Sequence, residues 1–566
     1  MERGRGGEVF LTNTIAKTLR YSLLFLPLLF LLAFFFYPLL SILGVSLSAD
    51  GRLDLSSFGE VATSRYYLDT LWFTTWQAAL STVLTLALAL PTAYVFARYT
   101  FPGKSILMSL STLPFVLPTV VVAAAFSALI GPNGLANTVL MRLFQLESAP
   151  IQLERTLTII LIVHVFYNYT LALRMISSFW ANQSLRMEEA ARVLGAHGWR
   201  LWWTVRLPAL RPAILAAALL IFIFTFTSFG VILILGGPRF ATLEVEVYRQ
   251  ATSFFNLPVA AALSLVQIAF MFALMLVYTR LQRQTATDIQ SAAQVARPPR
   301  TPGQRLFVAV NVFVMAAFSF APLLALVARS FMSADGFTTR FYTQLTANTR
   351  NSVLFVPPIE AIGNSLQFAI TTTLLALLLG LLTAYLLALP RSRLVAWLDP
   401  IFMLPLATSA VTLGFGFIIA PLFVSTGLRT NPVLLPLVHT LVAMPFVVRS
   451  VLPALRGIPP IVREAARVLG APPLVVWRLI DLPLISRGLI VGATFAFTVS
   501  MGEFGATLFI ARPDTPTMPV VIYRLLGQPG AVNYGQALAM STILMAVCAV
   551  SFILIERLRT AGVGEF

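Results

Sequence analysis

Near its start the chain carries a continuous apolar run, YSLLFLPLLFLLAFFFYPLLSILGVSL, which covers residues 21 to 47 without a charged side chain. A helix needs roughly 20 such residues to cross the ~30 Å hydrocarbon core of a bilayer. The run is longer than the roughly 7–15 apolar residues of a cleavable signal peptide, and it lacks a convincing small-residue cleavage site. We therefore expect a membrane span that remains in the mature protein.

The rest of the chain has the same character. It contains 566 residues, of which 58% are hydrophobic and 11% are charged, and its mean hydropathy is +0.86. A soluble domain carries about 25% charged residues. The composition excludes a soluble enzyme and predicts an all-α integral membrane protein. The single cysteine, Cys548, lies in an apolar run, so disulfides within the chain and cysteine-based metal sites are excluded as well.

The hydropathy of the sequence predicts about twelve membrane spans. Those of the first half lie near residues 21–46, 72–97, 106–130, 156–179, 209–235 and 258–281. Those of the second half lie near residues 306–328, 364–389, 397–422, 433–454, 484–510 and 535–556. Between the two sets lies a polar segment rich in Gln, Ala, Pro and Arg, residues 282–305, which we interpret as a cytoplasmic linker.

The formal net charge is +17, from 39 Lys and Arg against 22 Asp and Glu. Membrane proteins concentrate basic residues in their cytoplasmic loops, so this charge indicates membrane orientation rather than binding to nucleic acid. With a cytoplasmic N-terminus, the basic segments 186–211, 280–305 and 456–487 all face the cytoplasm, and the more acidic segment 50–69 lies outside. We expect both termini to be cytoplasmic. The chain is then a multi-pass protein of the bacterial inner membrane, in contact with lipid and not with nucleic acid.

An internal repeat relates the two sets of spans. The first half contains EEAARVLGAHGWRLWWTVRLP from Glu188, and the second contains REAARVLGAPPLVVWRLIDLP from Arg463, 275 residues later. Earlier landmarks match at a separation of 291 residues, so the first half carries 16 additional residues, which we place in the outer loop near 131–154. The sequence predicts two parallel six-helix modules, residues 1–281 and 306–566, joined by the linker 282–305.

Each repeat contains the pattern E-A-A-x3-G-x9-[IV]-x-L-P in a predicted cytoplasmic loop. Its residues are Glu189, Ala190, Ala191, Gly195, Leu207 and Pro208, and then Glu464, Ala465, Ala466, Gly470, Leu482 and Pro483. The alanines give a helix surface that another protein can approach closely, and the glutamate offers a charge to a basic or amide partner. The glycine allows a turn, and the proline suits the first turn of the next helix. The alternative interpretation is an amphipathic helix on the bilayer surface, with Trp199, Trp202 and Trp203 as its interfacial belt.

On this duplicated motif the chain resembles the permease subunits of ATP-binding-cassette importers, in which such a loop forms a short coupling helix that docks in a cleft of the ATPase subunit. The resemblance implies two partners, a cytoplasmic ATP-binding subunit in two copies and an extracytoplasmic substrate-binding protein. ATP and Mg would bind to the ATPase subunits, and this chain would hold no cofactor. Its sequence has no phosphate-binding loop, because Arg98 stands where the first glycine before Gly103 to Ser105 would be needed.

The candidate substrate pathway follows from one ionisable residue, Glu503, in the predicted eleventh span. Ser228 occupies the equivalent position of the first half. An ionisable side chain at that depth indicates a pathway, and the candidate pathway residues are Ser228, Phe229, Glu503 and Phe504. For Glu503 two alternatives stay open, a role in structure or gating, which we favour, and a role in substrate selectivity. No metal site is predicted, and we interpret the scattered His164 and His439 as repeat-related packing or polar positions.

Over nearly its whole length the chain is similar to the thiamine and ferric-iron class of importer permeases. The stretches HVFYNYTLALR from His164 and VSMGEFGATLF from Val499 resemble those of thiamine permeases. We therefore expect thiamine as the substrate. Ferric iron is the alternative, because intact pairs of coupling motifs are common in iron permeases. An ion-coupled secondary transporter or a channel is a more remote alternative, and both leave the duplicated motif unexplained.

Overall fold

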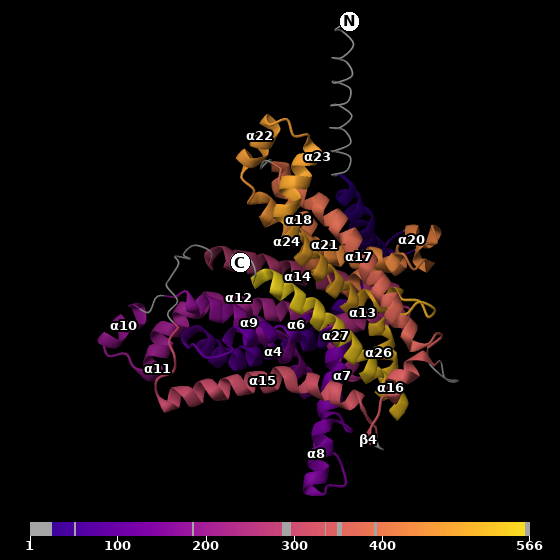
Figure 1. The fold of residues 1–566 in the computed structure, drawn as a ribbon. Coiled ribbons are helices and arrows are strands. Elements are labelled where there is room, and N and C mark those ends of the chain that lie inside the picture. Colours follow the sequence, from indigo (N-terminus) through magenta and orange to yellow (C-terminus); the bar gives the residue numbers. More distant parts are fainter. Residues whose placement is uncertain are drawn as a thin grey trace. The chain divides into compact units, whose positions relative to one another are not determined.

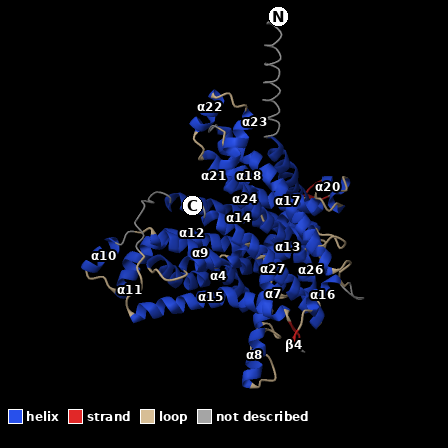
Figure 2. Ribbon diagram, viewed as in Figure 1, coloured by secondary structure: helices blue, strands red, loops and turns tan. Residues whose placement is uncertain are grey.

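The computed structural model of the chain describes residues 25–49, 52–183, 186–285, 296–333, 336–347, 354–389 and 393–560. These residues form mostly helices (Figures 1 and 2). The strands among them make two short antiparallel hairpins, β1 (Ser48–Ala49) with β2 (Arg52–Leu53) and β3 (Met332–Ser333) with β4 (Gly336–Phe337). The predicted all-α fold class is confirmed.

Within the described part of the chain, ten helices are long and apolar enough to cross a membrane. An eleventh span results if the bent pair Trp397–Leu406 and Ala410–Ile419 is counted as one. The prediction of a multi-pass membrane protein is therefore confirmed, whereas the number twelve and its division into six and six stay predictions. The predicted span at 484–510 is divided between α24 (Leu482–Gly502) and α25 (Gly505–Ile510).

Contacts divide the chain into two compact units, each described here by itself. One comprises the described residues of Ser46–Pro358 and Pro519–Ala549, and the other those of Met1–Val45, Ile359–Met518 and Val550–Phe566. We call them the 46–358 unit and the 359–518 unit. The N-terminal helix Phe25–Leu47, from the predicted first module, lies almost entirely in the 359–518 unit. The helix Pro302–Ser330, from the predicted second module, lies in the 46–358 unit. The predicted module boundaries stay a prediction, because residues 286–295 of the predicted linker lie outside the described residues.

The 46–358 unit contains the longest helices of the first half. Its elements after β2 are α3 (Ser56–Thr63), α4 (Arg65–Arg98), α5 (Lys104–Leu110), α6 (Leu113–Val116), α7 (Thr119–Ile130), α8 (Leu135–Phe144), α9 (Leu157–Ala181), α10 (Arg186–Val193), α11 (Gly198–Leu201), the π-helical turn η2 (Trp202–Arg206), α12 (Leu207–Phe226), the π-helical turn η3 (Ile232–Gly236), α13 (Leu243–Thr252), α14 (Leu257–Thr285), α15 (Pro302–Ser330), α16 (Arg340–Thr343), the 3-10 turn η4 (Gln344–Thr346), α26 (Met518–Leu526) and most of α27 (Ala531–Thr560).

Small residues allow the helices of this unit to pack closely. Helix α4 lies along α9 and α12, and its Ala89 and Ala93 are buried together with Ala172 of α9 and Ala217 of α12. Lipid offers no hydrophobic driving force between membrane helices, so their association depends on close van der Waals packing, which small side chains permit. Met315 shows that α15 belongs to the same core, because it is fully buried in it.

The 359–518 unit has a similar build. Its elements are the N-terminal helix Phe25–Leu47, which includes the π-helical turn η1 (Leu32–Phe36) and α2 (Tyr37–Leu47), and then α17 (Pro358–Leu387), α18 (Arg393–Ala407), α19 (Ala410–Ile419), α20 (Pro421–Ser425), the 3-10 turn η5 (Leu428–Thr430), α21 (Leu434–Arg456), α22 (Pro460–Val468), α23 (Pro473–Val476), the π-helical turn η6 (Trp477–Asp481), α24 and α25.

Helix α24 packs on α21 through two glycines four residues apart. A Cβ at Gly488 would lie 2.7 Å from the Ser450 carbonyl oxygen, and one at Gly492 would lie 3.1 Å from the Val447 Cα. This spacing of small residues brings two helix backbones close together in a membrane. Phe35 of the N-terminal helix is buried in the same core.

Several predicted spans are interrupted. The span predicted at 106–130 is interrupted before α7, which begins directly after Pro118. In the span predicted at 397–422, α18 and α19 meet at 90°, and the Ser409 hydroxyl accepts hydrogen bonds from the backbone N–H groups of residues 411 and 412. The span predicted at 209–235 stops being α-helical at Phe226 and continues as the π-helical turn η3. These breaks place polar groups and loops inside segments that are apolar on average.

Candidate coupling loops and intramembrane helix breaks

The first copy of the motif forms a short helix that ends in a left-handed turn. Glu189 and Ala190 on α10 are exposed, and Ala191 is half-buried. Gly195 has a φ of +86°, and the N–H of Ala196 donates to the Ala191 carbonyl oxygen at 2.9 Å. A glycine with positive φ after the last helical turn is a common way to end a helix.

The second copy has the same local form. Glu464 and Ala465 on α22 are exposed, and Ala466 is half-buried. Gly470 has a φ of +84°, and the N–H of Ala471 donates to the Ala466 carbonyl oxygen at 3.0 Å. In the described residues no atom lies within 4 Å of a Cβ built at either glycine. The structure therefore presents two equivalent loops whose motif faces are open.

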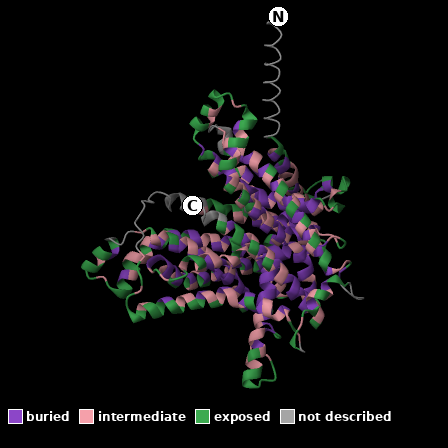
Figure 3. Ribbon diagram, viewed as in Figure 1, coloured by how far each residue is buried: buried purple, intermediate pink, exposed green. Residues whose placement is uncertain are grey.

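An apolar pair is exposed at the end of each of these helices. Val193 and Leu194 are 87% and 86% exposed, and Val468 and Leu469 are both 87% exposed. In Figure 3 the helices α10 and α22, located by their labels in Figure 1, are coloured mostly as exposed. Large apolar side chains so fully exposed outside the membrane spans suggest a surface that a partner covers.

The remaining motif residues begin the following membrane helices. Leu207 and Pro208 lie in the first turn of α12, and Leu482 and Pro483 lie in the first turn of α24. Proline is tolerated there because the N–H that it lacks would have no partner within the helix. Each of the two helices directly follows a π-helical turn, η2 or η6, at equivalent positions of the repeat.

Ion pairs connect α10 and α22, the candidate coupling helices, to these π-helical turns. The carboxylate of Glu188 accepts hydrogen bonds from Arg98 at 2.9 Å and from Arg206 at 2.8 Å. In the second half, the Arg463 Nε lies 2.7 Å from the Asp481 Oδ1. The sequence analysis missed both pairs. The available signal was the equal spacing of two opposite charges, 188 with 206 and 463 with 481, in the repeat.

The candidate pathway residues of the first half lie where α12 ends. Ser228 shares a hydrogen bond of 2.8 Å with the His164 Nε2, and the other ring nitrogen of His164 lies 3.3 Å from the Ser81 hydroxyl. Phe229 is buried with its ring 5.5 Å from that of Tyr248. His164 is thus a buried polar residue that holds the helix break, in agreement with its interpretation as a polar position.

The equivalent residues of the second half form a more strongly bonded cluster. One oxygen of Glu503 accepts from the Ala506 N–H and the other from the Thr507 N–H, both at 2.8 Å, and the Thr507 hydroxyl also bonds this carboxylate. The His439 Nε2 lies 3.4 Å from Glu503, and its Nδ1 is 2.8 Å from the Ser500 hydroxyl. Phe504 is buried beside this cluster. Glu503 therefore caps the N-terminus of α25, which favours the structural alternative for this residue.

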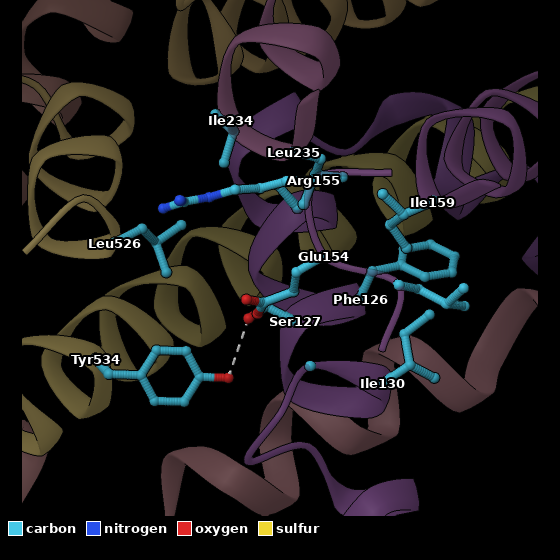
Figure 4. Close-up of a pocket in the computed structure, with 13 residues that line it drawn as sticks. Phe126, Ser127, Ile130, Glu154, Arg155, Ile159, Ile234, Leu235, Leu526 and Tyr534 are labelled. Carbon is cyan, nitrogen blue, oxygen red and sulfur yellow. Dashed lines mark hydrogen bonds between the residues drawn. The ribbon is translucent and has the colours of Figure 1, made fainter. Parts of the chain in front are cut away.

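A cavity of about 190 Å³ lies within the 46–358 unit (Figure 4). Its polar lining includes the hydroxyls of Ser127 and Tyr534, which lie 3.4 Å apart, and the side chains of Glu154 and Arg155. Part of the Glu154 side chain is exposed, but its partial burial raises the pKa of the carboxyl above its ordinary value, and Arg155 acts in the opposite direction.

The residues predicted to be additional in the first half contribute Gly131, Leu153 and Glu154 to the lining of this cavity. They contain α8, and the side chain of Asn137 holds the ends of the insertion together through bonds of 2.8 Å to the carbonyl oxygens of Gly131 and Ile151. Sequence reasoning did not predict the cavity. The pathway residues Ser228 and Phe229 do not line it, whereas Ile234 and Leu235, a few residues further on, do.

Comparison with known proteins identifies the family. A family model described as "Binding-protein-dependent transport system inner membrane component" matches residues 89–287, which include the first coupling motif. The thiamine transport system permease protein ThiP of Salmonella typhimurium is 27% identical over 506 residues, which cover 86% of this chain and 88% of that protein. The chain is an ABC importer permease.

Other relatives show that the similarity runs through both halves of this permease. ThiP of Brucella abortus is 28% identical over 494 residues, which cover 86% of each chain. A protein named probable ABC transporter permease protein y4fN, from Sinorhizobium fredii, is 26% identical over 552 residues, 94% of this chain and 95% of that protein. A permease is a transport subunit, so the helical build and the open loops of this chain fit its family.

Proposed function

We propose that this permease carries thiamine across the bacterial inner membrane as the membrane subunit of an ATP-driven importer. The observation that carries the proposal is the similarity to proteins named as thiamine transport permeases over 86% of the chain. An extracytoplasmic binding protein would deliver thiamine, in accordance with the binding-protein-dependent family. ATP and Mg would bind to two copies of a cytoplasmic ATPase subunit and not to this chain.

The two coupling loops are the surfaces on which we place the ATPase subunits. Each loop exposes a motif glutamate, Glu189 or Glu464, beside small alanines and an apolar Val-Leu pair. Covering apolar surface is worth about 25 cal/mol per Å², and the exposed carboxylate adds a specific polar contact. Because each half provides one such loop, two ATPase copies would bind. Both loops, and with them both termini, would then face the cytoplasm.

Helices α12 and α24 connect these loops to the helix breaks. Each begins directly after the π-helical turn of its loop, and they end two residues before Ser228 and one residue before Glu503, respectively. An α-helix of about 20 residues spans roughly 30 Å, so a displacement of the loop would reach the break through one rigid element. ATP binding would favour one of two arrangements of these helices and ATP hydrolysis the other, as alternating access requires.

The cavity in Figure 4 supports an organic cation as the substrate. It offers the carboxylate of Glu154, the hydroxyls of Ser127 and Tyr534 and the ring of Phe126, while Arg155 extends toward Leu526. A carboxylate attracts the positive ring of thiamine, and an aromatic face adds about 0.5–2 kcal/mol of cation–π attraction.

Uptake of labelled thiamine tests this function. Cells that lack other thiamine importers would express the permease with its own binding protein and ATPase subunit. We expect accumulation against the gradient, and its loss when the ATPase subunit is omitted. Accumulation of ferric iron without thiamine would assign the permease to the iron alternative. Uptake that persists without the ATPase subunit would indicate an ion-coupled transporter or a channel and would contradict the proposal.

A further inference from the structure

The two coupling helices are held by ion pairs of opposite polarity. Glu188 on α10 and Arg463 on α22 occupy equivalent positions of the repeat, and so do their partners Arg206 and Asp481. In the first half the acid lies on the coupling helix and the base on the π-helical turn, and in the second half the arrangement is reversed. Both halves therefore contain an ion pair at these two positions, although the charge at each position is opposite in the two halves.

A tyrosine near the C-terminal end of another long helix, α4 or α17, completes each cluster. Tyr94 and Tyr385 match at the earlier separation of 291 residues. The guanidinium carbon of Arg206 lies 5.2 Å from the centre of the Tyr94 ring, and the Tyr385 hydroxyl donates to the Asp481 Oδ2 at 3.3 Å. A tyrosine thus contacts the arginine through its ring face in the first half and the aspartate through its hydroxyl in the second half.

The first cluster contains an additional base, Arg98, whose equivalent in the second half is Leu389. The Arg98 side chain is only 8% exposed, and among the described residues its Nε and Nη1 are buried without a hydrogen-bond partner. Arg192 lies on α10 itself, 3.8 Å from Glu188, and is half exposed. Glu188 therefore faces three arginines, whereas Asp481 faces one arginine and one tyrosine hydroxyl.

Apart from these ion pairs, α10 and α22 are largely open. No residue of α22 is buried, and in α10 Glu188 is the buried residue among those whose burial is described. The partners Arg206 and Asp481 are the last residues of η2 and η6, so they stand directly before α12 and α24. π-Helical turns inside helices often occur at functional sites. Each pair therefore joins a coupling helix to the base of the membrane helix that follows it.

We propose that Glu188–Arg206 and Arg463–Asp481 are positioning pairs that transmit movement of the coupling helices to α12 and α24, with Tyr94 and Tyr385 as their supports. The inference rests on the proposed function, because it requires an ATPase docked on these helices. A buried or half-buried pair with short distances holds two elements in one geometry, and removing either partner leaves the other charge uncompensated. The geometry requires two opposite charges, but either of the two positions can carry the positive one.

Charge exchange in the second half tests this requirement. The variants Arg463→Glu and Asp481→Arg each place like charges together, and the double variant R463E/D481R restores a pair with the polarity of the first half. Tyr385 can then offer its ring to the new arginine, as Tyr94 does to Arg206. The matched control is Asp69→Arg, which breaks the exposed pair with Arg65 at 3.7 Å. We expect this control to be unaffected, because exposed pairs contribute little.

The measurement uses the complete importer, with ATPase subunit and binding protein, in proteoliposomes. Readouts are copurification of the ATPase subunit, ATP hydrolysis stimulated by the binding protein, and labelled thiamine imported per ATP hydrolysed. Each single variant should still bind the ATPase subunit but lose at least about tenfold in thiamine imported per ATP. The double variant should return to within about threefold of the wild type, since the two changes compensate each other.

The first half should respond differently. The double variant E188R/R206D should not recover, because the new arginine at position 188 would face the buried Arg98; Arg192 is half exposed, so solvent screens its charge. Adding Arg98→Leu, which introduces the residue found at the equivalent position 389, should restore import. This difference between the halves follows from Arg98. The amount of thiamine imported per ATP hydrolysed distinguishes it from a general loss of stability, which would also lower ATPase binding and ATP hydrolysis.

The proposal is overturned if the single variants import normally, or if R463E/D481R binds the ATPase subunit and remains as defective as the single variants. Failure of the proposed function gives a different result. A wild-type importer that hydrolyses ATP in response to its binding protein but imports no thiamine carries another substrate, and the stimulated hydrolysis still reports the charge exchange. A wild-type chain that binds no ATPase subunit would remove both proposals.

Discussion

Replacing the motif glycines by aspartate tests whether a partner protein covers the two loops, because the change should have little effect on the fold of this chain. Gly195 and Gly470 have φ values of +86° and +84°, and within the described chain a Cβ at either position meets no atom within 4 Å. The change therefore adds a side chain that this protein has room for. Any steric or electrostatic conflict with it would have to come from another molecule.

The effect on the fold itself is limited to backbone strain. A non-glycine residue in the left-handed region costs about 1–2 kcal/mol, and here the strain falls on the end of a short exposed helix. The variants should therefore insert and fold. If the ATPase subunit covers the loop, the new carboxylate becomes a buried charge without a partner, which costs several kcal/mol. A loss of 3 kcal/mol corresponds to roughly a hundredfold weaker association.

Gly103→Asp is the matched control. Gly103 has a φ of +77° and open space around its Cβ, and it lies in a predicted cytoplasmic loop without the motif. We expect thiamine uptake to be abolished in Gly195→Asp and Gly470→Asp, with normal amounts of chain in the membrane, and to be normal in Gly103→Asp. Normal uptake in both motif variants would refute the docking assignment. An equal loss in the control would attribute the effect to backbone strain.

Three further predictions concern packing, topology and the cavity. Gly488→Ala should destabilise the protein by about 1–3 kcal/mol, because its Cβ would meet the Ser450 carbonyl oxygen at 2.7 Å; Gly363→Ala, which has open space, should be neutral or stabilising in a thermal unfolding assay in detergent. A cysteine at Asn133, in a chain whose native cysteine is replaced by serine, should react with a membrane-impermeant thiol reagent in intact cells, and lack of labelling would contradict the predicted orientation. Burial raises the pKa of Glu154, so its carboxyl loses its charge at a higher pH than an ordinary glutamate. Thiamine uptake should fall as the external pH drops through that raised pKa, and Glu154→Gln should lower uptake at neutral pH and remove this step; an unchanged pH profile would exclude Glu154 from the substrate path.

Local patterns in the sequence were enough to predict the class of the protein and the local form of the candidate coupling loops. Hydropathy over about 20 residues identifies a membrane helix because the bilayer itself sets that length. The glycines at 195 and 470 end their helices with positive φ, and the prolines at 208 and 483 lie in the first helical turn, as the motif predicts. These features depend on neighbours within a few residues, so the sequence alone determines them.

Tertiary structure decided where the spans break and what holds the loops. An average over an apolar segment does not detect an interruption of one or two residues, such as the one at Glu503. The bonds by which Glu503 caps α25 are local, but its contact with His439, 64 residues earlier, is set by the packing of distant segments. The pair of Glu188 with Arg206 depends on a π-helical turn that orients the arginine. The assignment of α15 to the 46–358 unit, and of the N-terminal helix to the 359–518 unit, likewise follows from packing between distant segments. Any two apolar helices can be neighbours in a bilayer, and only the fit of their side chains selects which ones are.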